Sequence, residues 1–325
     1  MIDLSDLAKI NERYNMFSEI TPETSTDAEF AFSAKDNLTA MGFQARAGSA
    51  ILEGYRPVFD AACVERMRSA GGFLVGKTNM DEFGFGSFSM NSAYGVPRNP
   101  YDIERSCGGS SGGAACAAAV IDGHVALGVS TGGSIACPAS FCGVYGMAPT
   151  YGRVSRYGLI DYGNSMDKVG ILSGDAKDLG RYLPLISGDD MRDPVSCNHP
   201  PLQKRFRKLR SVAVVRGEAS AGVNSAMGSA EEELRSMSVD VETVSMDTLR
   251  YALPAYYVLA SAEGSTNIAR YCGLRYGRQD GDLSLKFDDY FTKMRSLYLG
   301  EETKRRVILG TFTRMMGFRD KYYAK

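Results

Sequence analysis

Two glycine-rich stretches carry serines that could do chemistry: Ser-Cys-Gly-Gly-Ser-Ser-Gly-Gly at residues 106–113 and Thr-Gly-Gly-Ser at residues 131–134. Glycine permits tight turns with positive φ and lets backbone N–H groups approach a ligand closely. Loops of this kind suit an oxyanion better than they suit a hydrophobic core. The pair therefore predicts two loops around one site, with a serine as the candidate nucleophile.

The segment between the loops predicts a buried helix. Residues 114–121 are small and compatible with a helix, and they read Ala-Ala-Cys-Ala-Ala-Ala-Val-Ile. We expect the N-terminus of this helix, with its positive dipole end, to face the reacting oxygen. Two other interpretations remain open. Gly-Ser loops can be plain flexible connections, and a phosphate cradle is disfavoured because neither loop continues into Gly-Lys-Ser/Thr.

Composition limits the class of protein. The chain has 325 residues, of which 44% are hydrophobic and 23% are charged, enough for one large domain or two ordinary ones. Lys and Arg number 37 against 38 Asp and Glu, so the formal charge is −1. No global basic field attracts nucleic acid, and any such contact would need a partner or a local patch.

The cysteines predict reduced thiols in a cytoplasmic protein. Their number is odd and they are scattered, at positions 63, 107, 116, 137, 142, 197 and 272. Their spacing includes no paired CxxC motif, so we expect no metal site. The first residues do not form a signal peptide, and no apolar run approaches the roughly 18–20 residues that span a bilayer. We therefore expect a chain that is neither secreted nor embedded in a membrane.

The N-terminal part combines a helix pattern with a strand that ends in a lysine. Residues 4–19 have apolar side chains at three- and four-residue steps, which predicts a docking helix, and a linker follows at 21–27. Residues 30–37 predict a strand that presents Lys35 at its end. The ends of strands are where α/β enzymes place their chemistry.

Strand and helix patterns then alternate. A helix is predicted at 61–71, with strands at 73–76, 125–129, 211–215 and 239–244, a helix near 224–237 and a helical region over 251–325. The stretch 189–201 reads as a surface crossing. This alternation predicts an α/β fold with a largely parallel sheet covered by helices.

A serine nucleophile requires a base. The only histidines are His124, which lies in a turn, and His199, in the surface crossing, and both read as structural or solvated. A lysine can replace histidine when burial lowers its pKa. Lys35 follows an apolar strand and suits this role best, although most lysines are simply solvated.

Several motifs resemble the amidase signature family. The signature elements are Lys-Asp-Asn at 35–37, Gly-Gly-Ser-Ser-Gly-Gly at 108–113 and Gly-Gly-Ser-Ile at 132–135. Longer runs at 76–83, 149–159 and 261–271 resemble, within that family, the A subunits of Glu-tRNA(Gln) amidotransferases. The resemblance implies one domain over 1–325, with a mixed, largely parallel, twisted sheet covered on both faces. Its parts would be a docking helix and linker at 1–27, a catalytic core at 28–190 and the remainder at 202–325.

The resemblance also implies a Ser–cisSer–Lys triad. Ser134 would attack the amide, while Ser110 would relay its proton to neutral Lys35. Backbone N–H groups of the second loop would hold the oxyanion, namely those of Thr131, Gly132 and Gly133.

Two further residues would recognise the α-amino acid end of glutamine by the same resemblance. These are Tyr256 and Arg306, with Arg305 as the neighbouring alternative for Arg306. An Arg suits a carboxylate because its guanidinium fork is planar and always charged. The plain alternatives are a solvated helix face for either Arg and core packing for Tyr256.

The implied activity is that of a glutaminase subunit that releases ammonia for converting Glu-tRNA(Gln), or Asp-tRNA(Asn), to its amidated form. A B-type subunit, with a small C-type subunit, would bind most of the tRNA and use ATP and Mg²⁺, and this chain itself would need no cofactor. The alternatives are a different amidase of small molecules and a non-catalytic scaffold subunit.

The sequence also departs from the family pattern. Ser130 and Ala136 stand where the family usually has Asp and Arg, and Met90 replaces a usual glutamate. If that Asp and Arg normally pair with each other, losing both together would be tolerable, because removing one buried partner alone is the costly case. The chain ends at Lys325, where family members continue through a C-terminal segment.

Overall fold

A computed structural model describes residues 4–23, 27–197 and 209–324. Its contacts divide the chain into two compact units. The first comprises Met1–Pro201 with Val258–Lys325, and the second comprises Leu202–Tyr257. The expected single domain with its three parts stays a prediction, and each unit is described by itself.

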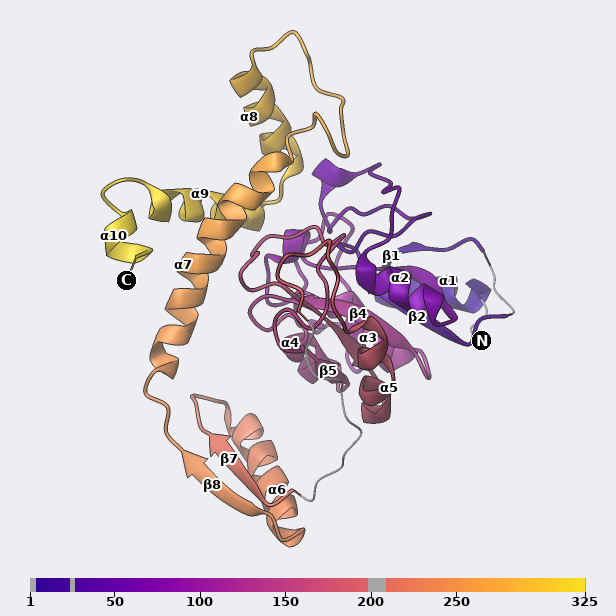
Figure 1. The fold of residues 1–325 in the computed structure, drawn as a ribbon, viewed down its shortest axis with the longest axis vertical. Helices are drawn as coiled ribbons and strands as arrows, with labels where there is room; N and C mark the ends of the chain where they lie inside the picture. The colour runs from indigo at the N-terminus through magenta and orange to yellow at the C-terminus, as the bar shows by residue number, and fades with distance from the viewer. Residues whose placement is uncertain (1–3, 24–26, 198–208, 325) are drawn as a thin grey trace. The chain divides into compact units, whose positions relative to one another are not determined.

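The helices and strands of the described residues are drawn in Figure 1, which labels most of them. The strands are β1 (Phe17–Ile20), β2 (Phe30–Lys35), β3 (Gly72–Thr78), β4 (Val125–Ser130), β5 (Tyr145–Met147), β6 (Lys168–Ser173), β7 (Ser211–Val215) and β8 (Asp240–Val244). The α-helices are α1 (Leu4–Tyr14), α2 (Ala62–Ser69), α3 (Gly112–Val120), α4 (Ala136–Phe141), α5 (Ala176–Ile186), α6 (Ala221–Ser236), α7 (Leu249–Asn267), α8 (Phe287–Tyr298), α9 (Glu301–Arg314) and α10 (Arg319–Tyr322). Short 3-10 turns are η1 (Ala50–Leu52), η2 (Glu82–Gly84) and η3 (Ile268–Arg270).

The first unit is built on a mixed sheet with strand order β1-β3-β2-β4-β6-β5. β2 pairs in parallel with both β3 and β4, whereas the pairs β1–β3, β4–β6 and β5–β6 are antiparallel. The α/β class and the mixed sheet are thus confirmed, but parallel pairing is confined to the centre, so "largely parallel" was wrong. A run of apolar residues shows that a strand is buried and does not reveal its direction.

Helices cover both faces of this sheet. On one face, α1, α3 and α4 contribute Leu7, Ala115 and Ala139 to a core with sheet residues such as Leu172. On the other face, α2 and α5 contribute buried side chains, including Met67 and Leu183, to a second core. Each fully buried large apolar side chain contributes roughly 1.5–3 kcal/mol to folding, so the two cores hold the sheet rigidly at the centre of the unit.

The N-terminal helix is shorter than its pattern predicts. α1 ends at Tyr14, and Phe17 begins strand β1 instead of a further helical turn. Asn15 has φ 49°, a left-handed conformation that ends a right-handed helix. Leu7 is nevertheless fully buried, so the helix does dock on the sheet. The expected helix at 61–71 is confirmed as α2, and Gly71 with φ 85° makes the turn into β3.

The second unit contains the predicted strand–helix–strand element. β7 and β8 are parallel neighbours, and α6 connects them. Ser220 caps α6 by accepting the Val223 N–H. α7 begins in this unit and ends in the first, where α8, α9 and α10 confirm the predicted helical region. Within the described parts of the chain, no helix combines the length and the apolar character needed to cross a membrane.

Candidate active site

The three parallel strands end at one edge of the sheet. Lys35 is the last residue of β2 and pairs with Thr78, the last residue of β3. β4, the other parallel neighbour of β2, ends at Ser130, directly before the second glycine-rich loop. Carboxyl ends of adjacent parallel strands meet at the same edge, which is where α/β proteins place their sites. The strand edge therefore gathers the predicted lysine and the predicted nucleophile loop.

Lys35 is buried beside Ser110. The residue is only 1% exposed. The Lys35 Nζ lies 2.7 Å from Ser110 Oγ and donates to the Val129 carbonyl at 3.2 Å. Burial lowers the pKa of Lys35 to about 7, against the opposing attraction of Asp81 and Asp167. A large share of this lysine is therefore neutral near pH 7, and in that form its lone pair can accept the proton of Ser110.

The loop that carries Ser110 packs against a buried carboxylate. The Gly109–Ser110 peptide bond is cis. A Cβ at Gly109 would lie 2.3 Å from Asp81 Oδ2, so only glycine fits there. The Ser110 carbonyl in turn accepts the Asp81 N–H at 3.3 Å. The loop and Asp81 thus fix each other, and Ser110 is held against Lys35.

Ser134 lies beside this loop, shortly before the start of α4. Its carbonyl accepts the Ser111 N–H at 3.3 Å, and its side chain is buried. Among the described residues, no hydrogen bond joins the hydroxyls of Ser110 and Ser134. The structure therefore brings Lys35 and Ser110 into direct contact, and a main-chain hydrogen bond holds Ser134 beside the Ser110 loop. The hydrogen bond between the Ser110 and Ser134 hydroxyls that the expected triad requires is not formed among the described residues.

Side chains hold the loop at residues 131–134, which is expected to bind the oxyanion. The Gly133 N–H donates to Ser130 Oγ at 3.2 Å, so this donor is already occupied. Thr131 Oγ1 donates to Asp167 Oδ1 at 2.6 Å, and Gly132 is exposed. Ser130, which stands where the family usually has Asp, therefore acts as an acceptor within the loop.

Two buried carboxylates near Lys35, those of Asp81 and Asp167, were not predicted from the sequence. Asp167 accepts the Tyr162 and Gly163 N–H groups at 3.0 Å each, and burial raises its pKa to about 6. Asp81 accepts N–H groups from Ser89 and Asn91, and burial raises its pKa as well. Both favour the charged form of Lys35.

Arg306 lies in the first unit with the triad, on α9. It is 7% exposed, and its Nε donates to Glu302 Oε1 at 2.7 Å. Its guanidinium is 6.0 Å from the Phe85 ring. Phe85 follows Gly84, where a Cβ would lie 3.5 Å from Ser110 Oγ. Arg306 is therefore linked to the site through one short turn.

The other substrate-binding candidates differ from Arg306. The Arg305 side chain is 74% exposed, so the plain interpretation of a solvated helix face fits it. Tyr256 packs edge-to-face with Tyr257 at 5.6 Å between ring centroids. It belongs to the second unit and is described apart from the triad. Its role stays a prediction.

His124 and the first N–H groups of α3 have partners within the chain. His124 Nε2 is 2.9 Å from Ser33 Oγ, and burial lowers its pKa to about 4, so it is a neutral structural residue as expected. His199 lies outside the described residues. The first N–H groups of α3 donate to Ser89 Oγ and the Asn79 carbonyl. These N–H groups are therefore occupied by acceptors of the chain, while the expectation that the positive dipole end of α3 faces the reacting oxygen stays a prediction.

No cluster of three or more His, Cys, Asp or Glu residues suited to a metal ion occurs in the part of the chain that the structure describes. All seven cysteines lie in that part, and each is a free thiol. The site itself offers a serine hydroxyl and a lysine amine with a lowered pKa.

Comparisons with known proteins show which proteins the chain resembles. The Amidase family matches residues 30–325. A curated relative, the A subunit of the Glutamyl-tRNA(Gln) amidotransferase of Archaeoglobus fulgidus, is 42% identical over 294 residues, which cover 90% of this chain and 64% of the relative. The chain thus spans less than two thirds of that protein's length.

Solved structures give the same result. The A subunit of the Glutamyl-tRNA(Gln) amidotransferase of Thermotoga maritima has a TM-score of 0.79 at 31% identity, covering 99% of this chain and 68% of that one. The native peptide amidase of Stenotrophomonas maltophilia has a TM-score of 0.80 at 28% identity, covering 99% of this chain and 72% of that one.

Proposed function

This chain belongs to the amidase family, and from that premise we propose that it hydrolyses the side-chain amide of glutamine and supplies ammonia to a tRNA-dependent amidotransferase. The observation that carries the proposal is the 2.7 Å contact between the buried Lys35 Nζ and Ser110 Oγ. A neutral lysine held on a serine hydroxyl is a base for a second serine.

In the proposed reaction, the Ser134 hydroxyl attacks the amide carbon of glutamine. Its proton passes to Ser110 while the Ser110 proton passes to neutral Lys35. Ser110 then gives one proton to the leaving nitrogen and regains one from protonated Lys35, so the nitrogen departs as ammonia, and water hydrolyses the acyl-enzyme to glutamate. The hydroxyls of Ser110 and Ser134 must come into hydrogen-bond distance for the first step.

The oxyanion is held by main-chain donors of the second loop in this proposal. The N–H groups of Thr131, Gly132 and Gly133 are the candidates. Each well-placed donor contributes about 3–4 kcal/mol to transition-state stabilisation in comparable enzymes. The Gly133 N–H can join only after it leaves Ser130 Oγ.

Arg306 is proposed to bind the α-carboxylate of glutamine. Its burial beside Phe85 would strengthen an ion pair with a bound carboxylate. Tyr256 is proposed to contact the α-amino end. The planar guanidinium would favour glutamine over a simple amide, because the simple amide has no α-carboxylate for it to bind.

Partners complete the proposed activity. We propose a B-type subunit that uses ATP and Mg²⁺ and binds most of the tRNA, together with a small C-type subunit, in the cytoplasm. The relatives' name, which makes each of them the A subunit of a Glutamyl-tRNA(Gln) amidotransferase, supports this assembly. The net charge of −1 agrees with a chain that leaves tRNA binding to its partner.

A second candidate is a hydrolase of other amides, which the similarity to a peptide amidase favours. A non-catalytic scaffold is the third, favoured by Ser130 and Ala136 and opposed by the intact Lys35–Ser110 contact. Substrate range separates the first two, because only glutamine uses the carboxylate site.

The test is ammonia release from glutamine by the chain, alone and mixed with a B-type subunit. Ser134→Ala and Lys35→Ala should each abolish turnover, whereas Lys177→Ala, which alters an exposed lysine, should leave it intact. Unfolding midpoints should confirm that the variants are folded. If the wild type with its partner releases no more ammonia than Ser134→Ala while the complex forms, the scaffold interpretation replaces this proposal.

A further inference from the structure

A buried glutamate, Glu82, joins two parts of the chain that lie far apart in sequence. It is 2% exposed, and its carboxylate accepts from the Gly300 N–H at 2.8 Å, from Thr303 Oγ1 at 2.5 Å and from Ser49 Oγ. Gly300 lies 218 residues further along the chain. A carboxylate that accepts charge-assisted hydrogen bonds from several directions holds its neighbours firmly.

At one end of this link is the first turn of α9. Its N-cap residue is Gly300, which offers no side chain to satisfy the first N–H groups of the helix. Glu82, from another part of the chain, accepts the N–H of Gly300 itself and the hydroxyl of Thr303 in the first turn, and its negative charge suits the positive end of the helix dipole. Arg306, the proposed carboxylate-binding residue, lies in the following turn of the same helix.

At the other end is the η2 turn, which contacts the site through neighbours of Glu82. Asp81 packs on Gly109 beside Ser110. Gly84 has φ 84°, and a Cβ there would lie 3.5 Å from Ser110 Oγ and 3.1 Å from the Tyr162 ring. Phe85 lies under the Arg306 guanidinium. The η2 turn and the two residues that flank it, Asp81 and Phe85, therefore lie between the Ser110 loop and Arg306.

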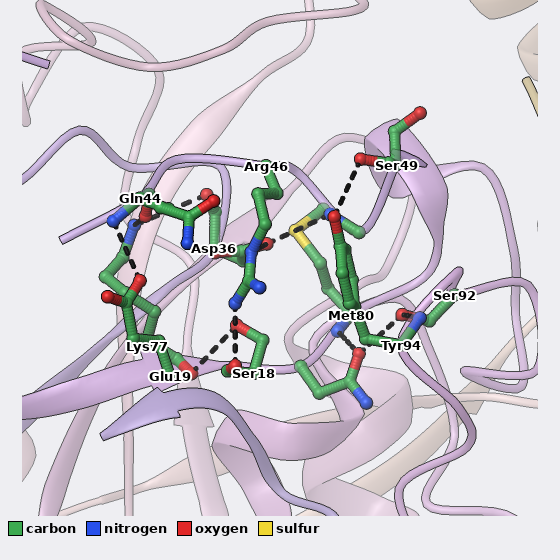
Figure 2. Close-up of polar contacts among 12 residues, drawn as sticks. Ser18, Glu19, Asp36, Gln44, Arg46, Ser49, Lys77, Met80, Ser92 and Tyr94 are labelled. Atoms are coloured by element: carbon green, nitrogen blue, oxygen red, sulfur yellow. Dashed lines mark hydrogen bonds and ion pairs between the residues drawn. The ribbon is translucent and has the colours of Figure 1, made fainter. Parts of the chain in front are cut away.

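The Ser49 contact extends the link to the strand end that bears Lys35. Ser49 follows Gly48, whose N–H donates to Asp36 Oδ2 at 3.1 Å, and Asp36 is the residue directly after Lys35. Figure 2 shows this neighbourhood, with Tyr94 donating to the Ser49 carbonyl and Arg46 beside Tyr94. The segment that Glu82 contacts through Ser49 is therefore also held by hydrogen bonds to Asp36 and Tyr94.

We infer that Glu82 is a positioning residue that holds the first turn of α9, and with it Arg306, in register with the Lys35–Ser110 pair. The inference rests on the proposed function, because it gives Glu82 its effect on glutamine through Arg306. The role is indirect: Glu82 sets the distance between the group that binds the carboxylate and the groups that attack the amide. Losing it should weaken glutamine binding more than it weakens amide chemistry.

The test compares four single variants, and Glu82→Gln is also made in an Arg306→Ala background. Glu82→Gln keeps the shape of the side chain and removes its charge. Thr303→Val removes one partner, and Thr303→Ser restores its hydroxyl. Glu301→Gln is the matched control, because Glu301 begins the same helix and its side chain is 90% exposed. KM and kcat are measured for glutamine and for butyramide, which lacks the α-carboxylate, and amide hydrogen exchange is followed over residues 300–306.

The inference expects Glu82→Gln and Thr303→Val to raise KM for glutamine about tenfold, with a smaller loss in kcat and a smaller effect on butyramide. Thr303→Ser and Glu301→Gln should resemble the wild type. Exchange over residues 300–306 should accelerate in the first two variants alone. In an Arg306→Ala background, Glu82→Gln should add little to KM.

The outcomes separate this inference from the proposed function. If the wild type hydrolyses neither amide, the proposed function fails, and the effect on glutamine assigned to Glu82 fails with it. If the wild type is active but Glu82→Gln lowers kcat on glutamine and butyramide equally, Glu82 does not act through Arg306 and the inference is wrong. Unchanged exchange in a folded Glu82→Gln variant would also overturn it, whatever the activity.

Discussion

A lysine works as a base only where it loses its proton near neutral pH. The pKa of Lys35 is lowered to about 7 by burial, so the active, neutral form increases as the pH rises through that value. We predict that kcat/KM for amide hydrolysis rises with pH and levels off above about pH 8. A pH–rate profile on the wild type checks this.

Lys35→Arg is the control for this profile, because a guanidinium keeps its proton throughout the range and should be inactive at every pH. A profile that keeps rising towards the ordinary pKa of lysine, 10.5, would contradict the prediction. Such a result would mean that Asp81 and Asp167 outweigh burial and keep Lys35 charged at neutral pH.

The hydrogen bond between Thr131 and Asp167 fixes the loop that precedes Ser134. Because Asp167 also accepts two N–H groups, it anchors the Thr131 side chain rigidly. We predict that Thr131→Val and Asp167→Asn each lower kcat about tenfold, since a misplaced nucleophile loses alignment with the amide.

The two substitutions should not add. The double variant should resemble the worse single variant, because both remove one contact, and Thr131→Ser should keep near-normal activity because it retains the hydroxyl. Steady-state kinetics on the four variants tests this cycle. Full additivity would show that Thr131 and Asp167 act separately.

At the scale of elements, two helical glycines make opposite predictions. A Cβ at Gly113, in the first turn of α3, would lie 2.4 Å from the Met16 carbonyl oxygen and 2.5 Å from that of Asn79. Gly180, inside α5, has nothing within 4 Å of the same position. We predict that Gly113→Ala destabilises the fold by about 2 kcal/mol or more through overpacking. Gly180→Ala should stabilise it by roughly 0.5–1 kcal/mol.

Urea unfolding midpoints of the two variants and the wild type test this pair. The chemical change is identical, so the difference isolates the close approach of α3 to the backbone beside β1 and β3. Equal midpoints would mean that α3 can shift away from these carbonyls, and the rigid placement of Ser110 at its N-terminus would then be in doubt.

The sequence predicts elements better than it predicts their partners. Strand ends, the Gly71 turn and the burial of Lys35 follow from local pattern, and the resemblance names the triad residues. The pattern predicts none of the antiparallel strands β1, β5 and β6, whose place depends on pairing, and it misses the end of α1 at Asn15, which depends on one left-handed residue. Asp167 could not be assigned a role, because its partner Thr131 lies 36 residues away and no motif joins them.

At the scale of the whole molecule, the charge of the chain limits how strongly it can attract a nucleic acid. The chain carries 37 basic and 38 acidic residues, and many of the arginines are already paired with carboxylates, as Arg156 is with Asp193 and Arg278 with Glu53. Binding to a polyanion draws its free energy from cations that release counterions from phosphates. Paired arginines on a neutral chain supply little of it.

We therefore predict that the chain alone binds tRNA more weakly than about 100 µM at physiological salt, and that its affinity depends only slightly on salt concentration. Adding a B-type subunit should produce tight binding with a steep salt dependence, because the phosphate contacts then come from that subunit. Filter binding or fluorescence anisotropy at several salt concentrations measures both, with an unrelated RNA as control. Micromolar binding by the chain alone, lost steeply as salt increases, would show instead that a local basic surface on this chain contacts tRNA directly and that the proposed division of labour is wrong.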